Sequence, residues 1–305
     1  MIIEKIHTCT GHKAAVYTLA PGRDERHFLS AGGDGWVVEW NLDDPETGQL
    51  LASVENQVFS LCTLSPHRLV AGNMNGGVHW IDRDDPAQTR NIQHHQKGVF
   101  DISVAGAWVF TAGGEGSVTR WDRESGRSLE SYQLSNQSLR AVAFSETRNE
   151  LAVGGSDCSI YLLDAQTLAL KQVLKDAHGN SIFTLAYTPD QQFLLSGGRD
   201  AMLKVWQSGV PATSGFIPFA GTPEFPAHLF TINHIVFSPD GSLFATASRD
   251  KTLKIWDTRS FELLKVVDTI RYGGHINSVN RLLWMKDCLV SCSDDRTVSI
   301  WRISP

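Results

Sequence analysis

The sequence lacks the features that mark several classes of protein. Its five cysteines are an odd number with no CxxC pair, which argues against a disulfide framework and against a structural zinc site. No run of about 18 apolar residues occurs, and Glu4 and Lys5 stand where a signal peptide has its apolar core. The formal net charge of -6 disfavours nucleic acid or an anionic membrane as a partner. We therefore expect a cytoplasmic protein with reduced thiols.

Phosphate-binding glycine loops and amphipathic helices are also lacking. The Gly-Gly pairs that begin at Gly32, Gly113, Gly154 and Gly197 precede predicted strands, whereas a phosphate loop precedes a helix. Few stretches keep an apolar period of about 3.6 residues, and turn residues instead recur roughly every 8 to 12 residues. This spacing indicates an all-β chain.

One short pattern recurs along nearly the whole chain. Its clearest copy, residues 248–257, reads SRDKTLKIWD. Alignment of the copies gives seven anchor residues: Trp40, Trp80, Trp121, Leu163, Trp206, Trp256 and Trp301. Successive anchors are 40, 41, 42, 43, 50 and 45 residues apart. This is close to the period of about 40 to 45 residues that is typical of four-stranded propeller blades.

These copies resemble the WD-repeat (tryptophan-aspartate repeat) family from end to end. The Trp-Asp pair itself stands at Trp121-Asp122 and Trp256-Asp257, and Leu163-Asp164 is a degenerate copy. The resemblance implies one domain, 1-305, folded as a seven-bladed β-propeller of four-stranded antiparallel blades. It also implies a non-catalytic scaffold that binds other proteins.

The two ends of the chain are expected to close the ring. The last copy supplies only three strands, whereas the apolar run 2–6 precedes the first copy and belongs to no copy. We predict that 2–6 forms the outer strand of the last blade, because closure protects the blade edges.

The sixth copy shows the four predicted strands most clearly, at 232–237, 243–247, 252–256 and 263–267. The interval 207–228 before it is longer than its counterparts and contains four prolines. Because proline cannot donate to a sheet, we expect a short outer strand near Phe216 followed by an irregular loop. A bland insertion and a partner-specific loop both remain open for this segment.

Five of the seven copies carry a His, a hydroxyl residue and a carboxylate at fixed places before the anchor Trp. The family resemblance implies that these residues form a buried hydrogen-bonded network in each blade. The five sets are His12, Ser30, Asp34 and Trp40; His95, Thr111, Glu115 and Trp121; His178, Ser196, Asp200 and Trp206; His228, Thr246, Asp250 and Trp256; and His275, Ser291, Asp295 and Trp301.

The same residue types could form a hydrolytic triad, which needs an exposed nucleophile beside an oxyanion hole. A catalytic set is needed once, whereas a structural set recurs with every unit, so five copies favour the structural role. The second and fourth copies have Val70 and Val153 at the hydroxyl position and lack the His. We predict that these two blades are apolar there.

A metal site at His94 and His95 is disfavoured, because neighbouring side chains on a strand point to opposite faces and His95 already belongs to a network. We predict no metal and no cofactor.

The mouth of the central channel is the predicted partner site. By resemblance, the residue after the first apolar position of each inner strand should line it. These residues are Tyr17, Phe59, Phe100, Arg140, Phe183, Asn233 and Asn280. Residues that precede a turn carboxylate should ring the same face, and they include Arg199, Arg249 and Asp294.

Exposed aromatic residues of this kind anchor protein interfaces. We therefore expect the mouth to bind a protein or peptide with an apolar anchor and acidic or phosphorylated groups. The Phe side chains would pack on the anchor, and Arg140, Arg199 and Arg249 would pair with the acidic or phosphate groups. We expect the scaffold to be monomeric by itself. Two other readings stay open: the aromatic side chains plug the channel, or the mouth holds a hydrolase-like enzyme site.

Overall fold

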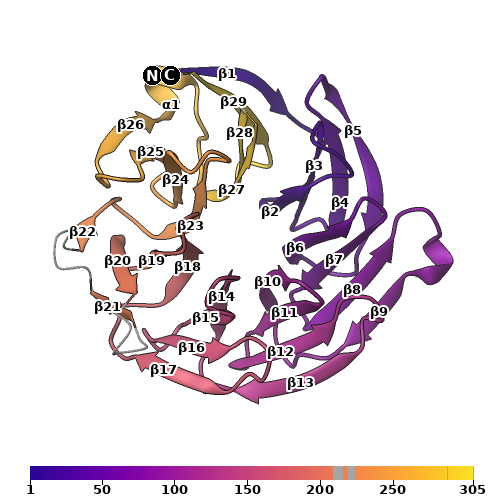
Figure 1. Cartoon of the computed structure of the whole chain (residues 1–305). Coiled ribbons are helices and arrows are strands. Elements are labelled where there is room, and N and C mark those ends of the chain that lie inside the picture. Colours follow the sequence, from indigo (N-terminus) through magenta and orange to yellow (C-terminus); the bar gives the residue numbers. More distant parts are fainter. Residues whose placement is uncertain (209–215, 219–223, 287, 305) are drawn as a thin grey trace.

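The computed structural model describes residues 1–208, 216–218, 224–286 and 288–304. Seven antiparallel sheets surround a central axis as the blades of a propeller (Figure 1). The predicted seven-bladed fold is therefore confirmed. We number the blades 1 to 7 in chain order, and the first strand of each blade lies nearest the axis.

Period-2 apolar runs cut by turn residues produce these strands. Blades 1 to 3 consist of β2 (Val16–Pro21), β3 (His27–Gly32), β4 (Trp36–Asn41) and β5 (Asp44–Ser53); β6 (Val58–Ser65), β7 (Arg68–Asn73), β8 (Gly77–Asp82) and β9 (Arg90–Gln93); and β10 (Val99–Ala105), β11 (Trp108–Gly113), β12 (Ser117–Asp122) and β13 (Ser128–Gln133). Blades 4 and 5 consist of β14 (Leu139–Ser145), β15 (Glu150–Gly155), β16 (Ile160–Asp164) and β17 (Leu170–Leu174); and β18 (Ile182–Tyr187), β19 (Phe193–Gly198), β20 (Met202–Ser208), β21 (Phe216–Pro218) and β22 (Phe225–Pro226).

The last two blades complete the ring. They consist of β23 (Ile232–Phe237), β24 (Leu243–Ser248), β25 (Leu253–Asp257) and β26 (Leu263–Val267); and β27 (Val279–Met285), β28 (Cys288–Ser293), β29 (Val298–Ser304) and β1 (Ile2–Cys9). Two short helical turns, η1 (Pro86–Gln88) and α1 (Thr269–Tyr272), lie between strands. Across the described ranges, the structure has no helix with the length and apolar character needed to span a membrane.

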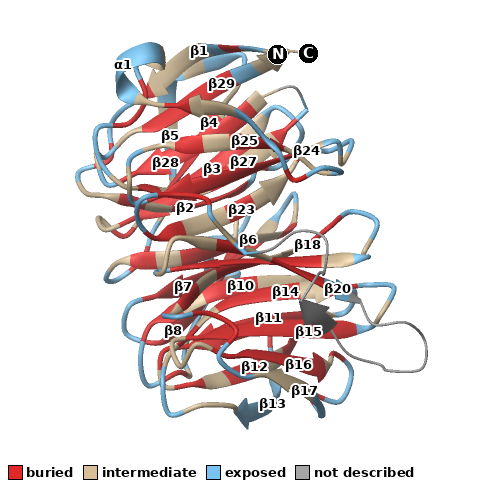
Figure 2. Cartoon of the chain, turned by 90° about the vertical axis from the view of Figure 1, so that its left-hand side faces the viewer, coloured by how far each residue is buried: buried red, intermediate tan, exposed pale blue. Residues whose placement is uncertain are grey.

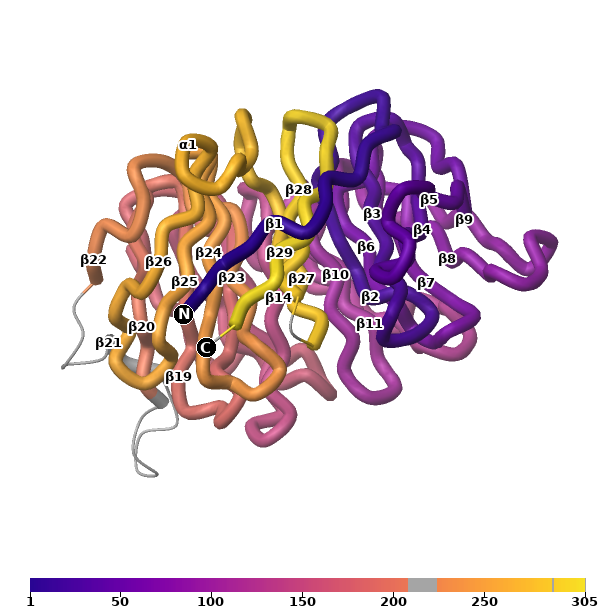
Figure 3. Tube along the Cα trace, turned by 90° about the horizontal axis from the view of Figure 1, so that it is seen from above, coloured from indigo at the N-terminus to yellow at the C-terminus, as the bar shows by residue number. Residues whose placement is uncertain are grey.

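The ring closes through the pairing of β1 with β29. The register runs antiparallel from Ile2 opposite Ser304 to Cys9 opposite Val298. Figure 1 and Figure 3 show the two chain ends side by side on blade 7. The predicted closure is confirmed, and the closing strand continues three residues beyond the predicted range 2–6, to Cys9.

In blade 6 the predicted strand boundaries differ from those observed by one residue at most. β25 begins at Leu253 because the Thr252 hydroxyl bonds to Asp250 in the preceding turn, at 2.6 Å. In the long interval 207–228, β21 and β22 both pair with β20 and share the outer edge of blade 5. The remainder of that prediction falls on 209–215 and 219–223, outside the described residues.

The core lies between neighbouring blades. Figure 2 shows buried residues along the inner strands and exposed residues in the loops. One cluster joins Phe110 of blade 3 to Leu151 of blade 4, and both side chains are fully buried. Burial of such a side chain contributes about 1.5–3 kcal/mol. The blades therefore stabilise one another, and the ring holds the inner strands around the channel.

Candidate binding face at the channel mouth

Every inner strand contains a β-bulge at the predicted mouth position. The register of the first two strands slips across one residue in each blade. The slips lie between residues 16 and 18, 58 and 60, 99 and 101, 139 and 141, 182 and 184, 232 and 234, and 279 and 281. The extra residue of a bulge leaves the ladder, so its side chain is re-aimed. The bulges are what allow these side chains to leave the blades.

The seven bulge residues line one pocket of about 260 Å³. They are Tyr17, Phe59, Phe100, Arg140, Phe183, Asn233 and Asn280. All seven are half-buried. Arg281 lines the same pocket, and the sequence reasoning missed it. The structure thus brings together the predicted channel-mouth set from all seven blades.

Five of these side chains form one continuous arc from blade 1 to blade 5. The ring centroids of Tyr17 and Phe59 are 5.4 Å apart, as are those of Phe59 and Phe100. The Arg140 guanidinium lies 4.4 Å from the Phe100 centroid and 4.9 Å from the Phe183 centroid. Each cation–π contact contributes about 0.5–1 kcal/mol or more. The arc therefore presents flat apolar surface with a cation held inside it.

Three arginines of the candidate face have no carboxylate partner among the described residues. Burial lowers the pKa of Arg140, and the nearby charge of Arg199 lowers it further. The Arg140 Nε donates to the Ser156 hydroxyl at 2.9 Å. Within the described ranges, Arg140, Arg199 and Arg249 form no ion pair, and the last two side chains are exposed. An anionic ligand could therefore neutralise them.

The other half of the mouth uses amide groups to join blades. The Asn233 Nδ2 donates to the Ser278 hydroxyl at 3.0 Å and to the Val279 carbonyl at 2.8 Å. The Asn280 Nδ2 donates to the Val16 carbonyl and to Asp294, both at 2.8 Å. Three of the predicted partner residues, Asn233, Asn280 and Asp294, thus make hydrogen bonds within the fold.

An ion pair bridges the channel below the mouth. The Arg281 Nη1 of blade 7 lies 3.1 Å from the Asp101 Oδ1 of blade 3. The other carboxylate oxygen of Asp101 accepts the backbone N–H of Val142 in blade 4 at 2.9 Å. These contacts connect three blades across the axis and give the mouth a polar floor.

His234 also links two blades, because its Nδ1 accepts the Leu282 N–H at 3.3 Å. Burial and the charge of Arg281 hold the pKa of His234 well below its usual range, so the ring is neutral and can accept. The sequence carried a signal for this floor that the reasoning did not use. The residue after each mouth position is polar in six of seven blades: Thr18, Ser60, Asp101, Thr184, His234 and Arg281.

Each of the five predicted networks is present as a chain of three bonds. The His Nδ1 donates to the carboxylate at 2.5–3.0 Å. The hydroxyl donates to the His Nε2 at 2.7–2.8 Å. It also accepts the Trp Nε1–H at 2.8–3.0 Å. The hydroxyls and imidazoles are buried, so these sets do not expose a nucleophile.

The networks of blades 3 and 6 contain groups with shifted pKa values. For Glu115, burial opposes ionisation, but the hydrogen bonds from His95 and Ser117 prevail and lower its pKa to about 2. The pKa of Asp250 is lowered in the same way, by the bond from His228 acting against burial. Burial lowers the pKa of His228, which keeps that imidazole neutral. Glu115 and Asp250 are therefore ionised at neutral pH.

The prediction that blades 2 and 4 are apolar in this region holds for Val70 and Val153, which are buried, but it is wrong for the turns beside them. In blade 4 the Asp157 carboxylate accepts hydrogen bonds from the Ser135 hydroxyl and the Tyr161 hydroxyl, both at 2.5 Å. In blade 2 the Asn73 Oδ1 accepts the Gly77 N–H at 2.8 Å. The predicted anchor of blade 2 is one residue out of register. Ile81 pairs with Leu69, as Trp121 pairs with Val109 in blade 3. Ala71 therefore holds the hydroxyl position, and the buried Nε1 of Trp80 has no hydrogen-bond partner.

His94 and His95 do not lie on a strand, so the opposite-face argument about them was wrong. They follow β9, and their rings meet edge to face at 5.1 Å. His94 packs edge-on against Trp121 at 4.6 Å, with its Nε2 3.0 Å from the Thr119 hydroxyl. In the part of the chain that the structure describes, no group of three His, Cys, Asp or Glu residues could hold a metal ion.

Exposed apolar residues beside the mouth were also missed. Leu229 and Phe230, which are 84% and 59% exposed, precede the blade 6 bulge residue in the loop that leads into β23. Ile276, which is 62% exposed, occupies the corresponding loop before β27. Large exposed apolar groups of this kind mark interaction surfaces. They enlarge the candidate binding face over blades 6 and 7.

Comparison with known proteins identifies the family. A family described as "WD domain, G-beta repeat" matches residues 3–41, 170–207, 221–257 and 265–302. The chain belongs to the WD-repeat family. This WD-repeat chain is also similar to the WD40 β-propeller domain of Doa1, with a TM-score of 0.84, 18% identity, and coverage of 99% of this chain and 97% of that one. At that identity the likeness concerns the fold alone.

The curated relatives of this WD-repeat chain are distant. It is 23% identical over 224 residues to eukaryotic translation initiation factor 3 subunit I of Neosartorya fischeri, covering 66% of this chain and 65% of that protein. It is 25% identical over 191 residues to protein groucho of Drosophila melanogaster, covering 61% of this chain and 26% of that protein. The chain thus spans less than two thirds of the length of these relatives.

Proposed function

We propose that this WD-repeat protein is a non-catalytic scaffold whose channel mouth binds a segment of a partner protein. One observation carries the proposal: seven bulge residues, one from each blade, converge on a single pocket, and five of them form a continuous arc of aromatic rings and a guanidinium. A relative named as a subunit of translation initiation factor 3 supports a role in an assembly.

The chemistry of the face suggests the chemistry of the segment. The arc formed by Phe59, Phe100 and Phe183 offers flat surface on which an apolar anchor can pack. Arg140, Arg199 and Arg249 offer charge to acidic or phosphorylated groups, which guanidinium binds with two parallel hydrogen bonds. The proposed ligand is therefore a peptide with an aromatic or aliphatic anchor next to acidic residues.

We further propose that the protein is monomeric by itself and lies in the cytoplasm. Cys9 and Cys292 are buried free thiols, and burial raises the pKa of Cys9 to about 12. Such thiols are unreactive, which suits a reducing compartment. The net charge of -6 supports a protein partner rather than nucleic acid or membrane.

Selection of a random peptide library on the immobilised protein tests the proposal. We expect enriched sequences to combine an aromatic or large aliphatic residue with Asp or Glu. A synthetic peptide of the enriched sequence should bind the Phe59→Ala, Phe100→Ala, Phe183→Ala triple variant at least tenfold more weakly, which corresponds to about 1.4 kcal/mol. The Arg140→Gln variant should lose the preference for acidic residues.

Tyr132→Ala is the matched control, because Tyr132 is an exposed aromatic on the outer strand β13. It should bind the peptide as the unmodified protein does. If the triple variant keeps its melting temperature and still binds with full affinity, the aromatic arc only fills the channel and the proposed site is wrong.

A further inference from the structure

The turns between the third and fourth strands of blades 3, 4 and 6 share one construction. The last residue of the third strand is an Asp, and it accepts a hydrogen bond from the hydroxyl three residues later. The pairs are Asp122 with Ser125, Asp164 with Thr167, and Asp257 with Ser260. The residue after the hydroxyl has a left-handed backbone: Gly126 at φ 60°, Leu168 at φ 53° and Phe261 at φ 57°. These three residues are therefore structural equivalents.

In blades 4 and 6 the side chain at this position fills the groove toward the preceding blade. Leu168 is fully buried in the cluster that includes Trp108, the first residue of the second strand of blade 3. Phe261 meets Phe193, the corresponding residue of blade 5, with centroids 5.8 Å apart at 86°. Each of these turns therefore places an apolar side chain into the neighbouring blade.

Blade 3 has Gly126 at this position, and the groove toward blade 2 is open. A cavity of about 370 Å³ lies there. Its apolar wall consists of Leu64, Leu69, Trp80 and Ile81. Arg68 takes the place that Trp108 and Phe193 hold in the filled grooves. The chain thus lacks both apolar groups that meet in the equivalent grooves, and the Trp80 ring lies directly against Gly126 beside the cavity.

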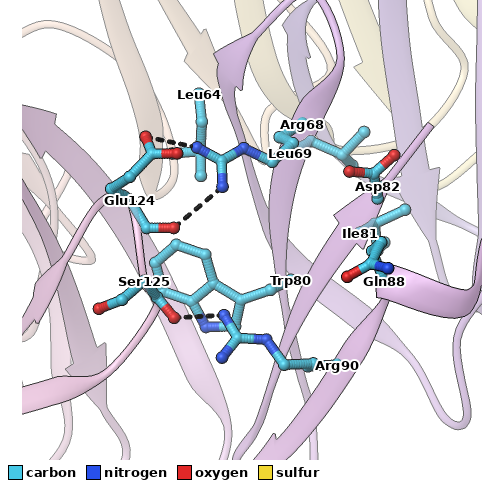
Figure 4. Close-up of a pocket in the computed structure, with 10 residues that line it drawn as sticks. All are labelled: Leu64, Arg68, Leu69, Trp80, Ile81, Asp82, Gln88, Arg90, Glu124 and Ser125. Carbon is cyan, nitrogen blue, oxygen red and sulfur yellow. Dashed lines mark hydrogen bonds and ion pairs between the residues drawn. The ribbon is translucent and has the colours of Figure 1, made fainter. Parts of the chain in front are cut away.

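Two arginines flank the open groove. Figure 4 shows Arg68 and Arg90 reaching toward Glu124 and Ser125 on either side of Trp80. Arg68 donates to the Glu124 carboxylate at 2.7 Å and to its carbonyl at 2.9 Å. Arg90 donates to the Ser125 carbonyl. Within the described part of the chain Arg90 has no carboxylate partner, so its charge is available at the rim.

The groove lies on the face opposite the mouth. Arg68 is the first residue of the second strand of blade 2 and Asp82 is the last residue of its third strand. The mouth residue Phe59 lies at the other end of the blade, near the start of the first strand. A ligand in the groove therefore leaves the mouth free.

We propose that this groove binds a Phe or Leu side chain of a partner protein, with an adjacent acidic residue that pairs with Arg90. The chain itself fills the equivalent grooves with Leu168 and Phe261, which defines the size and the apolar character of the occupant. The free charge of Arg90 defines the acidic neighbour. With this site, the protein binds two partner segments on opposite faces.

N-acetyl-phenylalanine is a minimal probe, because it combines a phenylalanine side chain, like that of Phe261, with a carboxylate. The 15N-labelled indole N–H signals of the tryptophans report its position, since Trp80 lines the groove. We expect the signal of Trp80, assigned from the Trp80→Phe variant, to shift on titration. The amide of the probe, which has no charge, should bind more weakly.

Two variants separate the proposed contacts. Arg90→Gln should weaken binding of the acid form of the probe about threefold, because an exposed ion pair contributes about 0.2–1 kcal/mol. Binding of the amide should not change. Arg127 is an exposed arginine on the same turn, so Arg127→Gln is the matched control. It should change the affinity for neither the acid nor the amide. The triple alanine variant of the mouth should bind the probe normally, so this test stands apart from the proposed function.

Gly126→Leu should fill the groove from within, so the probe should no longer shift the Trp80 indole signal. A Cβ at this position would lie 2.5 Å from the Arg90 Nη2 and 2.8 Å from the Trp80 Cδ2, so both the end of Arg90 and the Trp80 ring must shift. Should that variant fail to fold, the Arg90→Gln and Arg127→Gln pair decides. The proposal is overturned if the Trp80 signal does not move, if acid and amide bind alike, or if folded Gly126→Leu still binds the probe.

Discussion

Blades 3 and 4 fix the same turn by different means. In blade 3, His95 connects Glu115 to Thr111 and the anchor Trp121. In blade 4, Asp157 accepts two hydroxyl groups and no histidine is involved. The difference shows that the turn carboxylate can be held without an imidazole.

A wider comparison of the blades identifies the shared requirement. In most blades a side-chain oxygen in the turn accepts the backbone N–H two residues later, at 3.0–3.2 Å. The acceptors are Asp34, Asn73, Asp157, Asp200, Asp250 and Asp295. This local bond sets the turn conformation. The histidine networks add a connection from that turn to the anchor Trp.

The largest loss of stability should follow from exchanging one network hydroxyl for a methyl group. Thr111→Val in blade 3 keeps the shape but removes the partner of both the Trp121 Nε1–H and the His95 Nε2. Because each buried polar group without a partner costs about 1–3 kcal/mol, we expect a loss of about 2–4 kcal/mol in the free energy of unfolding. Urea unfolding measures it.

The matching change in blade 2 sharpens the result. Ala71 stands where blade 3 has Thr111, and Ile81 stands where it has Trp121, so Ala71→Thr adds a buried hydroxyl to which no anchor indole donates. We expect a loss of about 1–3 kcal/mol in the free energy of unfolding. A gain in stability would contradict the view that the hydroxyl stabilises a blade only as part of the network.

Tyr161→Phe should give an intermediate effect in blade 4. The change removes one of the two hydroxyl donors to Asp157 and leaves Ser135 in place, so we expect a loss of about 1–2 kcal/mol in the free energy of unfolding. Tyr132→Phe, on the exposed strand β13, is the control and should have no effect. A neutral result for Tyr161→Phe would mean that its bond does not substitute for the histidine network.

Lowering the pH should reduce the stability that the histidine networks contribute, by a smaller amount than the substitutions above. The pKa of Glu115 is lowered to about 2 in the folded protein, whereas its ordinary value is 4.5. Its contribution to stability is therefore complete above the unfolded pKa and is lost as pH falls toward 2. In Glu115→Gln, the fall in melting temperature between pH 7 and pH 3 should be smaller by about 2 °C. Glu146→Gln, at an exposed position, should match the unmodified protein.

Features that repeat along the chain could be predicted from the sequence. The five networks, the mouth positions and every anchor except Trp80 recur at fixed offsets, so each copy supports the others. The number of blades and the closing strand follow from the same alignment. β1 extends to Cys9 because backbone pairing with β29 continues through the polar residues His7 and Thr8, which carry no apolar signal.

Features that depend on one blade could not be predicted in this way. In blade 4 the substitutes for the histidine, Ser135 and Tyr161, stand at different offsets, so an alignment of the repeats passes over them. The pair of Asp101 and Arg281 joins residues 180 apart. The open groove lies beside Gly126 and is lined by Arg68. These two residues stand where the equivalent grooves have apolar side chains, and neither residue gives a signal until those grooves are compared.

The closure of the ring has a mechanical consequence. Ile2 and Ser304 face each other at one end of the β1 and β29 pair, and Cys9 and Val298 face each other at the other end. A force pulling these chain ends apart loads the hydrogen bonds one after another, as in opening a zipper, and never all together. Blade 7 is therefore where the molecule should yield first under tension, and a tether on both ends would set the lifetime of the whole ring.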